Sequence, residues 1–261
     1  MKAVVVSRVY ADPAARGKLK ALVGQGVTLA VAVPDRWMPR GLQKEQKTSY
    51  GDDGGVRVVP VPVGRGGPDD DPTWNSGALR RLLGEFRPDL VQIEEEPWTR
   101  AAAVAARAAR RQRVPYVVLA RESLPARHGV VPGFRRGRVL KGARGLLGVN
   151  ESAVRLAVRR HPDLPTAVVP QLGVPVTLET GRPARQGLSI GFFGRLIPEK
   201  GLDLLFRAGV KVIGRWSITV VGSGPAQEEL EELAERLGIA GRVTWLGARP
   251  RQRVDEVWGT L

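Results

Sequence analysis

The stretch Gly194-Arg195-Leu196-Ile197-Pro198-Glu199-Lys200-Gly201 follows an apolar run at 188–193 and precedes a helical pattern. It is therefore expected at the carboxyl end of a strand in an α/β unit, where open α/β sheets bind their ligands. Glycine permits a tight turn, and Arg195 and Lys200 flank the start of a helix whose free N–H groups favour an anion. Two cations beside a helix N-terminus suit a diphosphate.

Apolar runs alternate with helical patterns along most of the chain, which predicts an α/β fold with doubly wound parallel sheets. In the first part, the expected strands are Ala3–Ser7, Val27–Val33, Val56–Val63, Leu90–Ile93, Tyr116–Leu119, Gly145–Val149 and Ala167–Val169. The expected helices there are Pro13–Val23, Trp74–Phe86, Thr99–Arg111, Phe134–Gly142 and Glu151–Arg160, the last with Asn150 as its N-cap. The polar segments 34–53 and 64–72 are expected to be surface loops.

A Gly/Pro-rich segment without periodicity, 172–186, indicates a boundary between two domains. We expect a Rossmann-like N-terminal domain at 1–175, a linker at 176–186 and a Rossmann-like C-terminal domain at 187–261. The second domain is predicted to contain strands Leu188–Phe193, Ser217–Val221 and Arg242–Leu246, and helices Lys200–Ile213, Ala226–Leu237 and Gln252–Trp258. Three strands with an exposed edge make a poor independent sheet, so the chain is expected to be truncated within this domain.

The composition excludes several classes of site. The chain has no cysteine, which excludes disulfides, thiolate metal sites and cysteine nucleophiles. Its 2 histidines, His128 and His161, do not favour a histidine metal site, and His128 is expected on a surface loop. No apolar run reaches the roughly 20 residues of a membrane span, which favours a cytoplasmic protein. The acidic runs at 52–53 and 69–71 lie in predicted loops, so we expect no metal site.

The formal net charge is +15, and 33 of the 41 basic residues are arginine. Two clusters stand out: Arg107, Arg110, Arg111 and Arg113, and Arg135, Arg136, Arg138, Lys141 and Arg144. They are interpreted as solvated helix faces, or as a surface attracted to an anionic membrane or a phosphorylated acceptor. Nucleic-acid binding is disfavoured because no aromatic residues are interleaved with the arginines.

Four segments in the second half occur in a characteristic order: Gly191–Arg195, Glu199–Gly201, Val221–Pro225 and Arg242–Gly247. This succession resembles the donor-binding half of glycosyltransferases of family GT4, which are retaining enzymes of GT-B architecture. The resemblance implies that Arg195 and Lys200 hold the diphosphate of a sugar nucleotide. It also implies donor-binding roles for Gly194, Gly222, Gly224, Val243 and Gly247.

The first half resembles the same family more generally. Val4–Ser7 followed by Arg16–Leu19 is similar to the first strand and the glycine-containing helix start of GT4 enzymes, where the backbone approaches the donor phosphate or the acceptor. Many members have two adjacent glycines at this point, and this chain has only Gly17. Gly17 is therefore a candidate donor contact and Lys18 a candidate acceptor contact. The alternative is an ordinary helix start with exposed cations.

Two further segments end predicted strands at the ligand edge of the first sheet. Glu94, Glu95 and Glu96 repel one another unless cations or acceptor hydroxyls face them. Glu95 is a candidate acceptor contact, with a solvated charge run as the alternative. GT4 enzymes frequently place a histidine at the position that aligns with Arg121. Here Arg121 or Glu122 would take its catalytic place.

The resemblance implies a retaining glycosyltransferase that moves a sugar from a nucleotide-diphosphate sugar to a glycan, lipid-linked or small-molecule acceptor. Synthesis of a cell-surface polysaccharide or glycoconjugate is the expected setting, with no metal cofactor. The arginine clusters add the expectation of peripheral contact with an anionic membrane. GT4 enzymes carry a pair of glutamates further along the second domain than this chain extends, so the chain alone is expected to be poorly active. The alternative is a non-catalytic GT-B-like binding module; a nucleic-acid partner is not expected.

Overall fold

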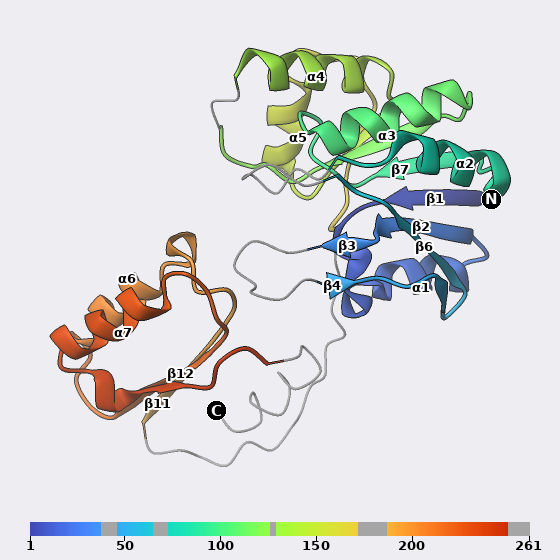
Figure 1. Ribbon diagram of the computed structural model, residues 1–261. Helices are drawn as coiled ribbons and strands as arrows, with labels where there is room; N and C mark the ends of the chain where they lie inside the picture. Colours follow the sequence, from blue (N-terminus) through green and yellow to red (C-terminus); the bar gives the residue numbers. More distant parts are fainter. Residues whose placement is uncertain (38–45, 65–72, 126–128, 172–186, 250–261) are drawn as a thin grey trace. The chain divides into compact units, whose positions relative to one another are not determined.

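The computed structural model describes residues 1–37, 46–64, 73–125, 129–171 and 187–249 (Figure 1). The chain divides into two units, the first comprising 1–37 with 45–174 and the second 38–44 with 175–261. Each unit has its own sheet and its own apolar core. The predicted linker at 176–186 and the predicted helix Gln252–Trp258 lie outside the described residues.

The first unit is built on an eight-stranded sheet in the order β10-β9-β8-β7-β1-β2-β6-β5. All neighbouring strands are parallel except β5 and β6. Its strands are β1 (Lys2–Val6), β2 (Thr28–Pro34), β5 (Gly51–Asp53), β6 (Val56–Val61), β7 (Leu90–Ile93), β8 (Tyr116–Ala120), β9 (Gly145–Gly148) and β10 (Thr166–Val168). A separate two-stranded ribbon consists of β3 (Arg36–Trp37) and β4 (Gln46–Lys47).

Helices cover both faces of this sheet, which explains the continuous valine run of β1. Val4 and Val6 belong to a core shared with α2, α3 and α4, whereas Val5 belongs to a core shared with α1 on the other face (Figure 1). The helices are α1 (Gly17–Gly24), α2 (Ser76–Phe86), α3 (Arg100–Arg111), α4 (Val130–Lys141) and α5 (Glu151–Val158), with 3-10 turns at Val9–Ala11 and Pro13–Ala15. The predicted N-cap is confirmed, because the Asn150 side chain accepts a hydrogen bond from Ala153 N at 2.9 Å.

The strand order reverses beside β1. The chain runs from β1 outward through β2 to β6 and then returns to place β7 on the opposite side of β1. The loops that follow β1 and β7 therefore leave the same edge of the sheet in different directions. Such a reversal opens a crevice at the carboxyl ends of the strands, where α/β sheets bind ligands.

The second unit has a parallel sheet in the order β11-β12-β13. Its elements are β11 (Leu188–Phe193), α6 (Leu202–Gly209), β12 (Trp216–Val221), α7 (Gln227–Arg236) and β13 (Val243–Trp245), with 3-10 turns at Pro198–Lys200 and Ala240–Arg242. The strands follow one another in sequence order, so right-handed crossovers place both helices on one face. Phe206 of α6 and Leu230 of α7 pack there over Ile218 and Val220.

Several predicted elements differ from the structure. The helix predicted at Phe134–Gly142 begins one turn earlier, at Val130. The segment 34–53 is not wholly loop, because Gly54 and Gly55, with φ of 64° and 82°, form a two-residue turn that pairs β5 with β6. The predicted helix Pro13–Val23 is interrupted at Arg16 and continues only as α1. The predicted helix Lys200–Ile213 shortens to α6, since Gly201 adopts a left-handed conformation with φ of 66° before it.

Two glycines hold the loops after β11 and β12 together. A Cβ atom at Gly222 would lie 1.8 Å from the Gly194 carbonyl oxygen, and one at Gly224 would lie 2.3 Å from the Leu196 carbonyl oxygen. Leu196 N donates to the Ser223 carbonyl at 2.9 Å, and Gly194 N donates to the Val221 carbonyl at 3.0 Å. The loop that carries Arg195 is therefore supported by direct backbone contact.

Gly222→Ala is expected to loosen this pair of loops, because the added methyl group overlaps backbone that has no rotamer to move away. Overpacking of this kind costs about 1–3 kcal/mol, so amide exchange in peptides covering 188–197 should accelerate about 10- to 100-fold. Hydrogen–deuterium exchange of the whole chain measures this. Gly241→Ala is the control, since its Cβ would meet nothing within 4 Å. Equal exchange in the two variants would contradict the prediction.

Candidate functional site

Three carboxylates are buried at the end of β7, beside the strand reversal. Glu94 and Glu95 are 0% exposed and Glu96 is 9% exposed. An ionised carboxylate in the interior costs several kcal/mol unless a cation or several donors face it. The interpretation of this run as solvated is therefore wrong. In the structure each carboxylate meets a cation from a different segment of the chain.

Glu94 binds the start of α1 to the end of β7. Its Oε1 accepts from Lys18 Nζ at 2.6 Å, and its Oε2 accepts from Tyr10 OH at 2.8 Å and from Gln171 Nε2 at 3.0 Å. The Gln92 side chain donates to Oε1 as well. Burial, and next the neighbouring Glu94 charge, raise the pKa of the Tyr10 hydroxyl, so this group remains a donor. Lys18, a predicted acceptor contact, is thus held by Glu94.

Glu95 fixes the first residue of the loop after Ser7. Its Oε1 accepts from Arg8 N at 3.0 Å, and its Oε2 lies 3.5 Å from Arg8 Nε. The Arg8 guanidinium in turn lies 5.4 Å from the centre of the Trp37 ring. Glu95 therefore positions Arg8 beside the point where the strand order reverses. Contact of Glu95 with an acceptor remains a prediction.

Glu96 organises the loop after β8, which carries the two residues predicted in place of the family's histidine. Its Oε1 accepts from Arg121 N at 2.7 Å and from Glu122 N at 3.1 Å, and it lies 3.5 Å from Arg121 Nε. Burial raises the pKa of the Glu96 carboxyl, and the Arg121 charge opposes this shift. Thr99, the N-cap of α3, donates its hydroxyl to the Glu96 carbonyl at 2.7 Å. Arg121 and Glu122 are thus brought to the edge that also holds Lys18 and Arg8.

Gly17 opens α1, next to a second ionic contact. A Cβ atom there would meet nothing within 4 Å, so the packing of the described chain does not itself require glycine. Arg16, 6% exposed, donates to the Tyr10 carbonyl at 2.8 Å and to Asp53 Oδ2 at 3.0 Å. Lys20 also pairs with Asp53. Hydrogen bonds from Lys20 and then from Arg16 lower the pKa of Asp53.

The second unit presents the two predicted diphosphate ligands on one loop. Arg195 and Lys200 have exposed side chains after β11; Arg195 precedes the turn Pro198–Lys200, and Lys200 is its last residue. Gly194 and Gly247 are not crowded, although Gly247 has a φ of 65°. Val243 is predicted to contact the donor, but in the structure it is 9% exposed and packs in the core under α6 and α7.

Sequence reasoning missed several residues of the first unit's edge. Arg8, Tyr10 and Gln171 were not singled out, and Glu94 and Glu96 were noted only as part of a charge run. The run itself carried the signal that cations had to be nearby. Nothing in the sequence marked Tyr10 or Gln171, since their partner lies 84 and 77 residues away. Within the described ranges, no group of acidic residues and histidines is arranged to hold a metal ion.

Comparison with known proteins identifies the family. Residues 11–171 match the family model described as "Glycosyl transferase 4-like domain", and residues 183–259 match "Glycosyl transferases group 1". The chain belongs to the glycosyl transferase 4-like family. Both matches fall where the sequence motifs predict them, so the predicted resemblance is confirmed.

Curated relatives match over shorter stretches. A D-inositol 3-phosphate glycosyltransferase of Mycobacteroides abscessus is 41% identical over 73 residues, which are 26% of this chain and 16% of that protein. An uncharacterized glycosyltransferase of Methanocaldococcus jannaschii is 38% identical over 58 residues, which are 22% of this chain and 15% of that protein. These alignments thus span less than a fifth of either relative.

Similarity to solved structures confirms the predicted GT-B fold. The Anabaena protein HepE, solved with UDP and glucose, has a TM-score of 0.67 and 17% identity, covering 96% of this chain and 70% of that one. The lipopolysaccharide outer core galactosyltransferase WaaB has a TM-score of 0.54 and 14% identity, covering 99% and 71%. Among the described residues, none of the helices combines the length and apolar character that a membrane crossing requires.

The Lys18–Glu94 pair is expected to be strongly coupled. Removing one partner of a buried ion pair costs about 3 kcal/mol, because it strands the other charge. A double-mutant cycle of Lys18→Met and Glu94→Gln, read by urea unfolding, should therefore give a coupling above about 1.5 kcal/mol. The exposed Arg155–Glu151 pair, at 3.1 Å, is the matched control and should give less than about 0.5 kcal/mol. Equal coupling energies in the two pairs would show that burial does not strengthen the Lys18–Glu94 interaction.

Asp53→Asn is expected to destabilise the chain in a pH-dependent way. The folded-state pKa of Asp53 is lowered, so its stabilisation is present above the unfolded pKa and is lost as pH falls through the folded pKa. The free energy of unfolding should drop by about 1 kcal/mol at pH 7, and this difference should shrink below about pH 4. Urea unfolding at several pH values measures it. Asp163→Asn, which replaces an exposed carboxylate, is the control. A loss of stability at Asp53 that does not depend on pH would contradict the prediction.

Proposed function

We propose that this chain transfers a glycosyl group from a nucleotide-diphosphate sugar to an acceptor. The observation that carries the proposal is the pair of exposed cations, Arg195 and Lys200, on the loop after β11. That loop lies inside the segment that matches the group 1 glycosyl transferases. UDP-sugars are the donors to try first, because HepE has been solved with UDP-glucose.

The chemistry asks for cations at the donor phosphates. Breaking the glycosyl–phosphate bond builds negative charge on the leaving diphosphate, and fixed cations aimed at that charge lower the barrier. Arg195 and Lys200 would supply this stabilisation. The loop is held by the backbone of Gly222 and Gly224, so it would not need to reorganise during the reaction. By resemblance to the family we propose retention of the anomeric configuration and no requirement for a metal ion.

The first unit would supply the acceptor side. Lys18 and Arg121 lie at the edge of the strand reversal, and Glu94 and Glu96 hold them there. Gly17 would allow close approach of a ligand to the start of α1, since no protein atom fills that space. The acceptor would be a glycan, a lipid-linked sugar or a small molecule, used on the cytoplasmic side in building a cell-surface polysaccharide or glycoconjugate.

Arg195→Ala and Lys200→Ala are each expected to lower kcat by about 10²–10³, as removal of one preorganised charge-stabilising donor does. Release of nucleoside diphosphate from a panel of UDP-, GDP- and ADP-sugars, with and without acceptor sugars, is the measurement. Arg207→Ala and Lys211→Ala are matched controls, because both side chains are exposed on the same unit and belong to α6 or follow it rather than to the loop. They should change kcat less than twofold.

The panel also distinguishes the alternative. Tight binding of one nucleoside diphosphate with no turnover of any sugar nucleotide would favour a GT-B-like binding module without catalysis. Equal losses in the loop variants and the controls would contradict the role given to Arg195 and Lys200 while leaving the transferase proposal standing.

A further inference from the structure

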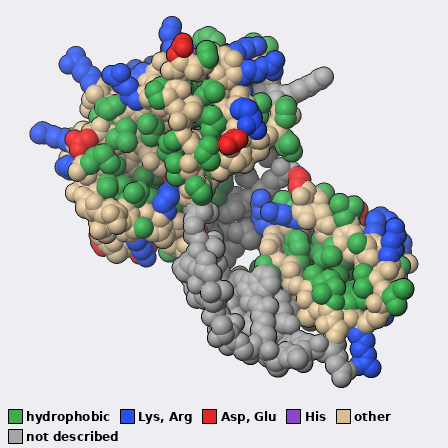
Figure 2. All heavy atoms as spheres, turned by 180° about the vertical axis from the view of Figure 1, so that it is seen from behind, with side chains coloured by type: hydrophobic (Ala, Val, Ile, Leu, Met, Phe, Trp, Pro, Cys, Tyr) green, Lys and Arg blue, Asp and Glu red, His purple; other side chains and the backbone are tan. Residues whose placement is uncertain are grey.

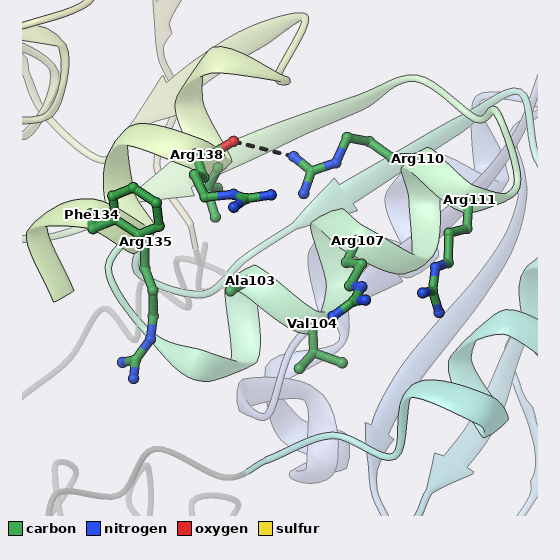
Figure 3. Close-up of a pocket in the computed structure, with 9 residues that line it drawn as sticks. Ala103, Val104, Arg107, Arg110, Arg111, Phe134, Arg135 and Arg138 are labelled. Carbon is green, nitrogen blue, oxygen red and sulfur yellow. Dashed lines mark hydrogen bonds between the residues drawn. The ribbon is translucent and has the colours of Figure 1, made fainter. Parts of the chain in front are cut away.

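Helices α3 and α4 enclose a hollow of about 630 Å³ on the first unit (Figure 3). Five arginines line it, Arg107, Arg110 and Arg111 from α3 and Arg135 and Arg138 from α4, together with apolar side chains. Figure 2 shows Lys and Arg side chains gathered along the upper edge of the larger body. None of these residues belongs to the carboxylate cluster or to the loop after β11.

The sequence of α3 explains why its arginines share one face. Arg107, Arg110 and Arg111 recur at helical spacing, while the opposite face consists of buried alanines. The frame between the helices is held by hydrogen bonds. Arg110 Nη1 donates to the Arg138 carbonyl at 3.1 Å, the dashed line in Figure 3, and to Tyr116 OH at 3.2 Å. Tyr116 OH donates to the Val139 carbonyl at 2.7 Å. The hollow is therefore a built feature rather than a gap between loose side chains.

The five arginines of the hollow lack the carboxylate partners that other cations of the unit have. Arg8 and Lys18 meet glutamates, and Arg16 meets an aspartate. Neither α3 nor α4 contains an acidic residue. Within the part of the chain that the structure describes, none of the five arginines of the hollow forms an ion pair with a carboxylate. Five like charges around one hollow repel one another, and an anion would relieve that repulsion.

The start of α4 adds an apolar element beside the charges. Val130 is 90% exposed, Val131 is 59% exposed and Phe134 is 64% exposed. The Arg138 guanidinium lies 5.6 Å from the centre of the Phe134 ring. Binding of a soluble anion would require only the arginines and would not use these exposed apolar side chains. Large exposed apolar side chains next to arginines are typical of a helix that lies in the interface of an anionic membrane.

We propose that the hollow and the exposed start of α4 form a docking face for an anionic phospholipid bilayer. The arginines bind lipid phosphates, while Val130, Val131 and Phe134 enter the acyl region below them. Charge complementarity and the adjoining apolar side chains together select this occupant. The inference is independent of the proposed glycosyl transfer, because membrane binding is measured without donor or acceptor.

The test is co-sedimentation of the whole chain with two kinds of vesicle at about physiological ionic strength. One kind is phosphatidylcholine alone, and the other is phosphatidylcholine mixed with about 30% phosphatidylglycerol. Binding is expected only with phosphatidylglycerol. The triple variant Arg107→Gln, Arg111→Gln, Arg135→Gln should bind about 100-fold more weakly, since each basic residue near the surface contributes a factor of about five. The matched control, Arg81→Gln, Arg159→Gln, Arg160→Gln, removes the same charge from other exposed positions and should weaken binding less than about threefold.

Phe134→Ser separates insertion from charge alone. It should weaken vesicle binding about tenfold, because a phenyl ring would no longer leave water. The proposal is overturned if phosphatidylglycerol does not promote binding, if the two triple variants lose binding equally, or if Phe134→Ser binds as the unchanged chain does. It is also overturned if inorganic phosphate at millimolar concentration displaces the vesicles, which would indicate a site for a free anion. Equally tight binding to duplex DNA would indicate a general polyanion surface and would overturn it as well.

Discussion

Three neighbouring carboxylates cannot be buried at the end of one strand unless cations come to meet them. In this chain the cations arrive from three segments: Arg8 from the loop after β1, Lys18 from α1 and Arg121 from the loop after β8. Apolar packing shapes the sheet beneath, but charge pairing joins the loops at its ligand edge. The arrangement of the candidate acceptor side thus depends on satisfying the carboxylates that follow β7.

The elements that sequence patterns predicted best are strands encoded as short, largely apolar runs between turn or loop residues. Leu90–Ile93, in the sheet covered on both faces, and Leu188–Phe193, whose sheet carries α6 and α7 on one face, were both predicted to the residue. The hairpin of β5 was missed although its Asp53-Gly54-Gly55 signal was present, because the polarity of the surrounding segment dominated the interpretation. Helix ends were misjudged where a backbone conformation, such as that of Gly201, decides them.

The site was predictable in kind but only partly in detail. Adjacent carboxylates after a buried strand imply nearby cations, yet the partner of Glu94 lies 76 residues away, and no local pattern encodes that pairing. Arg195 and Lys200 could be singled out from the sequence because the turn and both cations lie within one short stretch, and their role as diphosphate ligands stays a prediction. The arginine clusters of α3 and α4 were visible as charge, whereas the hollow between them requires the packing of two helices that the sequence separates.

The close contacts of Gly222 and Gly224 with the loop after β11 limit which substitutions this chain can accept, in evolution or in the laboratory. Any side chain at either position displaces backbone that the neighbouring strand needs, so both are closed to variation. Gly17, by contrast, faces open space. Substitutions at Gly17 are therefore expected to leave the packing of the chain intact and to fill the space beside the start of α1, whereas Gly222 and Gly224 must stay glycine. The two units therefore differ in how freely their motif glycines can vary: Gly17 of the first unit tolerates a side chain, and Gly222 and Gly224 of the second do not.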